Sequence, residues 1–198
     1  MKKLLVFALT ASLVGCGAHQ KDVDNADPMK YAETITPSDL KERVYIFASD
    51  EFEGRETGEP GQKKAAEYLK EQYKKFDIPS ALGGDDYFQE VPKSYFRGDT
   101  KASENVVAFI KGSEKPEEVL VISSHYDHVG MDKDGNVFNG ADDDASGTMG
   151  VVEIAQAFSE AVKDGYTPKR SILFLNNTGE EKGLVGSKFY TDNPIFPL

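Results

Sequence analysis

The 198-residue sequence has little cysteine, no apolar run long enough to cross a membrane, and a deficit of basic residues. Cys16 is the only cysteine, so an intramolecular disulfide is impossible. The apolar run over residues 4–14 is too short to span a bilayer. Acidic residues outnumber basic ones by 34 to 23, and the net charge of −11 excludes nucleic acid and an anionic membrane surface as electrostatic partners.

Several short motifs that mark enzyme classes are also missing. The sequence contains no Gly-x-Ser-x-Gly elbow, no His-Glu-x-x-His and no phosphate loop, so a serine hydrolase, a zincin and a nucleotide-binding protein lack support. Its length suffices for one domain with a sizeable core. The sequence shows no internal repeat and no sign of a second domain.

The N-terminus has the pattern of a leader. A basic start precedes the apolar run, which ends in Leu13-Val14-Gly15-Cys16 and resembles a bacterial lipobox. We predict a lipoprotein signal peptide over residues 1–15, a lipid on Cys16, a polar tether over residues 16–35, and a location in the bacterial cell envelope. If the organism is Gram-negative, Gly17 after the cysteine favours the outer membrane. The alternative is an ordinary signal peptide with an incidental cysteine.

The remainder, residues 36–198, alternates helical and strand-like patterns. Helices are predicted from Thr36 and over residues 63–76 and 145–162, and strands over residues 87–95, 106–110, 119–122 and 172–175. Pro92 places the first strand at a sheet edge, whereas the other three are continuous apolar runs typical of strands covered on both faces. A strand, loop, helix and strand in succession form a βαβ unit. We therefore predict an α/β fold, a three-layer α/β/α sandwich around a mixed, partly parallel sheet.

Acidic residues and a histidine follow two of these strands. They are His125 and Asp127, then Asp142–Asp144 before the next helix, then Glu180 and Glu181. Because ligands bind beyond the carboxyl ends of strands in open α/β sheets, we expect these segments to converge. Adjacent aspartates repel one another unless something strongly positive lies among them, and zinc takes imidazole and carboxylate ligands. The pattern indicates a zinc-type hydrolase, although a plain helix start also explains one or two of the aspartates.

Three segments resemble successive motifs of the M28 family of zinc metallopeptidases, the bacterial leucyl-type aminopeptidases. They are Ser124-His125-Tyr126-Asp127-His128-Val129-Gly130, Gly140-Ala141-Asp142-Asp143-Asp144-Ala145-Ser146-Gly147 and Thr178-Gly179-Glu180-Glu181-Lys182-Gly183-Leu184-Val185-Gly186-Ser187. Residues 50–61 also resemble the entry segment of that family, and the likeness covers residue 36 to the end. Motifs that occur together in this order are highly specific.

The resemblance implies two zinc ions and a role for each site residue. It makes His125 a ligand of one zinc, Asp143 the bridging ligand and Glu181 a ligand of the other zinc. It makes Glu180 the general base and acid, and Asp127 the residue that orients His125. The implied reaction is hydrolysis of the N-terminal peptide bond of peptide substrates.

The family pattern also contains two further ligands, an aspartate and a histidine, beyond the last residue of this sequence. We therefore expect a chain truncated at the C-terminus, a sheet incomplete on that side, weak zinc binding and no activity for the chain as written. His128 is interpreted as a loop residue or as a residue that supports a ligand, because it is too close to His125 for a second anchor. The resemblance further implies a cis peptide bond between Asp143 and Asp144.

Two other functions stay open. A glutaminyl cyclase shares the family's fold and uses one zinc, although the intact Asp-Asp-Asp motif favours a peptidase. An inactive or binding-only surface lipoprotein would explain the missing ligands. Zinc stoichiometry and hydrolysis of aminoacyl-anilides separate the three.

Overall fold

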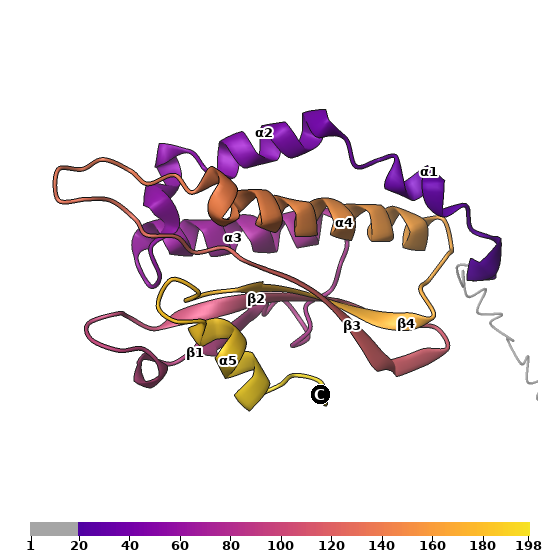
Figure 1. Ribbon diagram of the computed structural model, residues 1–198. Helices are drawn as coiled ribbons and strands as arrows, with labels where there is room; N and C mark the ends of the chain where they lie inside the picture. Colours follow the sequence, from indigo (N-terminus) through magenta and orange to yellow (C-terminus); the bar gives the residue numbers. More distant parts are fainter. Residues whose placement is uncertain (1–19) are drawn as a thin grey trace, which may run out of the picture.

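The computed structural model describes residues 20–198, which fold around a four-stranded sheet with the order β1-β2-β4-β3 (Figure 1). The strands are β1 (Phe88–Val91), β2 (Ser103–Ile110), β3 (Lys115–His125) and β4 (Arg170–Asn177). β2 pairs antiparallel with both β1 and β4, whereas β3 runs parallel to β4. The mixed, partly parallel sheet and the edge position of β1 are confirmed.

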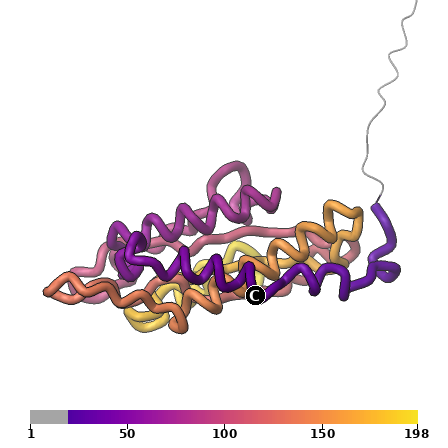
Figure 2. Tube along the Cα trace, turned by 90° about the horizontal axis from the view of Figure 1, so that it is seen from above, coloured from indigo at the N-terminus to yellow at the C-terminus, as the bar shows by residue number. Residues whose placement is uncertain are grey.

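Helices cover both faces of this sheet and make three layers (Figure 1), and the view from above shows the helices of one layer running side by side (Figure 2). The helices on one side are α1 (Pro28–Ala32), α2 (Pro37–Phe47), α3 (Pro60–Lys75) and α4 (Ser146–Lys163), and α5 (Val185–Asp192) lies on the other. The predicted α/β/α arrangement is therefore confirmed, with a single helix in its third layer among residues 20–198.

The βαβ unit β3–α4–β4 forms the centre of the core. Val151 and Ala155 on the apolar stripe of α4 are buried against Ile172 and Phe174 of β4. Full burial of an aliphatic or aromatic side chain of this size stabilises a fold by about 1.5–3 kcal/mol. This packing holds the carboxyl end of β4 and the start of α4 in a fixed relation, and the candidate site lies there.

The prediction that the strand at residues 119–122 is covered on both faces is wrong. β3 is an edge strand that pairs only with β4 within residues 20–198, and Leu120 and Val121 are 52% and 40% exposed. The reason is that α5 packs on the neighbouring strands, where its Tyr190 joins Val107 and Leu173 in one apolar cluster. β4, which was also predicted to be covered on both faces, is interior and has strand partners on both sides.

The polar composition of residues 20–35 predicts a tether, but these residues pack against the fold. Tyr31 of α1 is buried, and its hydroxyl donates to Asp164 Oδ2 over 2.9 Å at the end of α4. The Lys21 N–H donates to the Gly165 carbonyl over 2.9 Å. The predicted leader and Cys16 lie outside the described residues and stay predictions. Across residues 20–198, every helix is too short or too polar to cross a membrane.

Candidate metal centre

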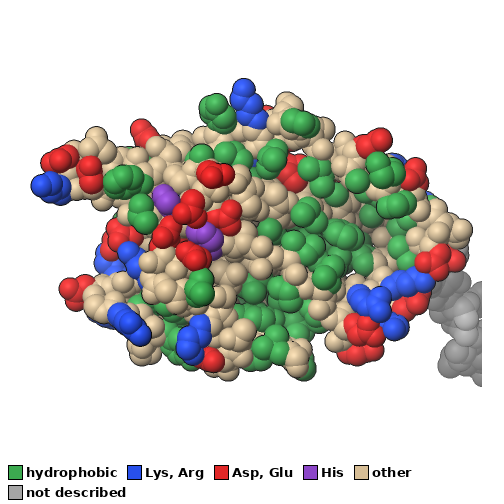
Figure 3. Space-filling model, in the orientation of Figure 1, with side chains coloured by type: hydrophobic (Ala, Val, Ile, Leu, Met, Phe, Trp, Pro, Cys, Tyr) green, Lys and Arg blue, Asp and Glu red, His purple; other side chains and the backbone are tan. Residues whose placement is uncertain are grey.

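The predicted convergence of acidic and imidazole side chains is present at the carboxyl ends of β3 and β4. His125 is the last residue of β3, and Glu180 and Glu181 follow β4. The Asp142–Asp144 segment immediately precedes α4. On the face drawn in Figure 3, histidine side chains lie among a group of acidic ones. The segments that the sequence predicted to converge therefore lie at one edge of the sheet.

His125 is held between two aspartates. Its Nε2 lies 3.1 Å from Asp143 Oδ1, and its Nδ1 lies 3.1 Å from the carbonyl oxygen and 3.7 Å from Oδ1 of Asp127. Burial alone would lower the pKa of His125, but the hydrogen bond and charge of Asp127, together with the charge of Asp144, raise it to about 9. The surroundings therefore favour positive charge at this imidazole, whether a proton or a metal ion supplies it.

Asp127 is itself fixed by two hydrogen bonds that the sequence did not predict. The Thr57 hydroxyl donates to its Oδ2 over 2.6 Å, and the Glu180 N–H donates to its Oδ1 over 3.2 Å. Both Asp127 and Thr57 are buried. One carboxylate thus connects the loop before α3 with His125 and with the backbone of Glu180.

The three adjacent aspartates are in different environments. Asp142 is exposed, whereas Asp144 accepts hydrogen bonds from the N–H groups of His125 (3.3 Å) and Gly147 (3.1 Å). Asp143 alone is close to both described histidines, with Oδ1 near His125 and Oδ2 4.0 Å from His128 Nδ1. The bond between Asp143 and Asp144 is cis, as predicted.

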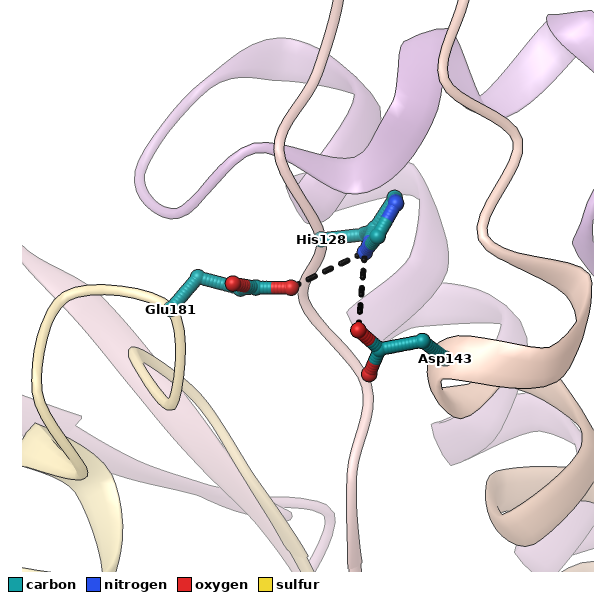
Figure 4. A group of neighbouring side chains, drawn as sticks. All are labelled: His128, Asp143 and Glu181. Carbon is teal, nitrogen blue, oxygen red and sulfur yellow. Dashed lines mark hydrogen bonds and ion pairs between the residues drawn. The ribbon is translucent and has the colours of Figure 1, made fainter.

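The side chains of His128, Asp143 and Glu181 form a second group around that carboxylate (Figure 4). His128 Nδ1 is 2.9 Å from Glu181 Oε1, and one ligand atom of each of the three residues lies within 4.8 Å of the others. This position is compatible with the prediction that His128 supports a ligand, and it also brings Nδ1 within reach of a metal held by the two carboxylates. Closeness to His125 in sequence is compatible with it because the chain is not helical there, so the two rings reach different oxygens of Asp143.

Arg55 ties together the loops that carry these ligands. Its fully buried guanidinium donates to four carbonyl oxygens over 2.8–2.9 Å, those of Phe47, Tyr126, Asn139 and Gly140. Burial lowers the pKa of Arg55 to about 10, and the charges of Asp127, Asp143 and Asp144 act in the opposite direction. Arg55 is therefore a buried cation whose positive charge stabilises the nearby aspartates of the site.

Gly140 makes room for the second imidazole. Its φ of +56° is unfavourable for other residues, and a Cβ there would lie 2.6 Å from the His128 ring and 2.4 Å from the Asp143 carbonyl oxygen. The His128 ring therefore packs directly on the glycine backbone. A glycine before an acidic run is the one sequence signal that points to this contact.

The donor set fits zinc, which binds imidazole nitrogen and carboxylate oxygen. Tetrahedral ligands about 2.0–2.1 Å from zinc lie about 3.3 Å from one another. The separations of 3.1 Å between His125 and Asp143, and of 2.9 and 4.0 Å from His128 to Glu181 and Asp143, bracket that value. Small side-chain shifts would complete the coordination.

Residues 105–197 match the sequence profile of peptidase family M28. This part of the chain belongs to family M28. The chain is similar to a "Probable glutamate carboxypeptidase LAMP1" of Arabidopsis thaliana, with 38% identity over 84 residues, 42% of this chain and 11% of that protein. It is also similar to "Aminopeptidase NAALADL1" of Rattus norvegicus, with 32% identity over 105 residues, 52% of this chain and 13% of that protein.

Solved structures of M28-type enzymes share the fold. LapB from Legionella pneumophila superposes with a TM-score of 0.60 at 24% identity, over 85% of this chain and 43% of that one. The aminopeptidase from Aneurinibacillus sp. strain AM-1 gives 0.62 at 14% identity, over 84% and 68%. A glutaminyl cyclase from Bacteroides thetaiotaomicron gives 0.59 at 16%, over 80% and 56%. At these identities the likeness concerns the fold, and the chain spans 10–19% of the length of the curated relatives.

Proposed function

We propose that the chain carries the site of a zinc-dependent aminopeptidase with two metal positions. The supporting observation is the Asp143 carboxylate, whose two oxygens face different imidazoles: Oδ1 is 3.1 Å from His125 and Oδ2 is 4.0 Å from His128. A carboxylate in that position suits two cations better than one. Membership of residues 105–197 in a peptidase family supports peptides as the substrate class.

In this proposal His125, Asp143 and Glu181 hold the metals, and Asp127 orients the ring of His125. Two zinc ions, when bound, would polarise the peptide carbonyl and make a water molecule more acidic. Glu180 would take a proton from the water that attacks the peptide carbonyl carbon and deliver it to the amine that leaves when the C–N bond breaks. Its N–H bonds to Asp127, so the base is anchored to the carboxylate that orients His125.

The test is the reaction of the purified chain with aminoacyl-anilides and with a peptide that begins with glutamine. A peptidase releases the free N-terminal residue, whereas a cyclase releases ammonia and leaves a pyroglutamyl peptide. We expect free amino acid, its loss on chelation and its return with added zinc. This replaces the expectation of an inactive chain, because the structure adds His128 to the side chains beside Asp143 and Glu181. Ammonia release would favour the glutaminyl cyclase, whose fold this chain shares. Zinc binding without either product would favour the binding-only lipoprotein.

We further propose that the mature protein is attached to the bacterial cell envelope through a lipid on Cys16. The support is the lipobox-like segment Leu13-Val14-Gly15-Cys16. The arrangement of the fold is compatible with it, because Lys21 bonds to Gly165 before β4 begins, whereas Glu181 follows the end of β4.

A further inference from the structure

His128 offers an imidazole to the candidate centre on the Glu181 side of Asp143. We propose that His128 Nδ1 is a ligand of the metal that Asp143 and Glu181 hold, and that this position is the tighter of the two in this chain. The inference rests on the proposed function for the roles of Asp143 and Glu181, and it assigns to His128 a role that the family resemblance does not give it.

The geometry of the three side chains supports coordination. Figure 4 shows the Nδ1 atom of His128 directed toward both carboxylates, which come from separate segments of the chain. Nδ1 is 2.9 Å from Glu181 Oε1 and 4.0 Å from Asp143 Oδ2, close to the spacing of about 3.3 Å between ligands of tetrahedral zinc. One neutral imidazole and two carboxylates carry a charge of −2, which a divalent cation neutralises.

The His128 ring is held in place for this duty. Its backbone N–H donates to the Arg55 carbonyl over 3.1 Å, its side chain is 14% exposed, and its ring packs on Gly140. A preorganised ligand loses little conformational entropy when it binds a metal. Arg55, whose guanidinium holds the neighbouring loops, therefore also fixes the backbone of His128 through its own carbonyl oxygen.

The two metal positions differ in the number of protein ligands. The Glu181 side has three, namely His128, Asp143 and Glu181 itself. Among the described residues the other side has His125 and Asp143, because Asp144 lies 4.0 Å from His125 Nε2 and accepts two backbone N–H groups. Metal binding strengthens with ligand count and with a preformed cage, so we expect one tightly and one weakly bound zinc.

The experiment compares two matched variants of the full chain, His128→Asn and His125→Asn. An asparagine amide nitrogen lies close to the position of Nδ1 and can donate to Glu181, so the His128 variant keeps the hydrogen bond but not the ligand. After zinc loading and dialysis against a weak chelator, bound metal is measured by mass spectrometry. We expect one zinc per chain in the wild type and in His125→Asn, and its loss in His128→Asn.

X-ray absorption at the zinc edge of the one-zinc wild type provides a readout that does not depend on the folding of a variant. One imidazole per zinc is expected, and it should remain in His125→Asn. Retention of the tight zinc by folded His128→Asn, or its loss from His125→Asn alone, would overturn this inference and leave the proposed function standing. A wild-type chain that retains no zinc would overturn both.

Discussion

At the residue scale, the two adjacent glutamates after β4 are assigned different duties. Removing the charge of Glu180 should remove the base and leave the metals, so Glu180→Gln is expected to lower kcat by about 10²–10⁴ with bound zinc unchanged. Glu181→Gln should lose zinc because it removes a ligand. Turnover of an aminoacyl-anilide and metal content are measured on the same samples. Loss of zinc from Glu180→Gln would show that the roles are exchanged.

Thr57 is expected to act on the metals through Asp127. Thr57→Val removes the hydroxyl that donates to Asp127 Oδ2 over 2.6 Å and leaves a buried carboxylate oxygen without this donor. Changes to groups that orient metal ligands typically cost about 10–100-fold in metal affinity or activity. We expect that loss for the second zinc equivalent, measured by competition with a chromophoric chelator. Thr57→Ser keeps the hydroxyl and should bind like the wild type; equal affinity in Thr57→Val would refute the role.

The residues that the sequence placed near one another at the sheet edge share one property, which is that each ends or follows a strand or precedes a helix. His125 and Glu181 were located because strand ends in a βαβ unit meet at one edge. Arg55, Thr57 and His128 were missed because their contacts depend on how residues 50–59 fold back over the sheet. No local periodicity encodes that path.

At the scale of elements, Arg43 joins three helices: an ion pair connects α2 with α4, and a hydrogen bond connects α2 with α3. Arg43 of α2 pairs through Nε with Glu153 of α4, and its Nη1 donates to Gln72 of α3 over 2.9 Å. Glu153 is 2% exposed, so Arg43→Ala would leave an uncompensated charge in the interior. Breaking such a pair costs about 3–5 kcal/mol. We expect that loss in the free energy of unfolding measured with urea.

The matched control for this pair is the double variant Arg43→Met/Glu153→Leu. It removes both charges and keeps much of the volume, and replacements of this kind are often neutral or stabilising. A double variant as unstable as Arg43→Ala would mean that packing, and not the unpaired charge, accounts for the loss.

Element type was predictable where a segment's own residues determine it, and burial was not. The apolar stripe of α4 predicts its helix and its buried face, and both are present. The apolar run of β3 does not indicate whether another layer covers the strand, so the sequence did not predict that Leu120 is exposed. α1 was missed because its five residues are too few for a periodic signal.

At the scale of the whole molecule, the N-terminal segment and the metal centre lie at different ends of β4. Lys21 bonds to Gly165, just before β4 begins, whereas Glu181 follows its end, and eight extended residues span about 25 Å. A lipid on Cys16 is therefore expected to leave the metal centre unaffected. We expect Cys16→Ser to abolish incorporation of labelled palmitate in a bacterial host and to leave zinc content and turnover unchanged. Lipid incorporation by Cys16→Ser would contradict the assignment.

The outer edge of β3 is a candidate surface for self-association in solution. Edge strands with unpaired backbone groups and exposed apolar side chains are sites of association. Within residues 20–198 this edge has no strand partner, and Leu120 and Val121 are exposed on it. We expect the chain to self-associate at micromolar concentration, as seen by sedimentation velocity, and Leu120→Lys to shift it toward monomer because a charge on an edge strand opposes pairing. Tyr45→Lys on α2 is the control, since Tyr45 is 72% exposed and lies away from the sheet. If Tyr45→Lys disperses the protein as well as Leu120→Lys does, general surface polarity and not the β3 edge is the cause.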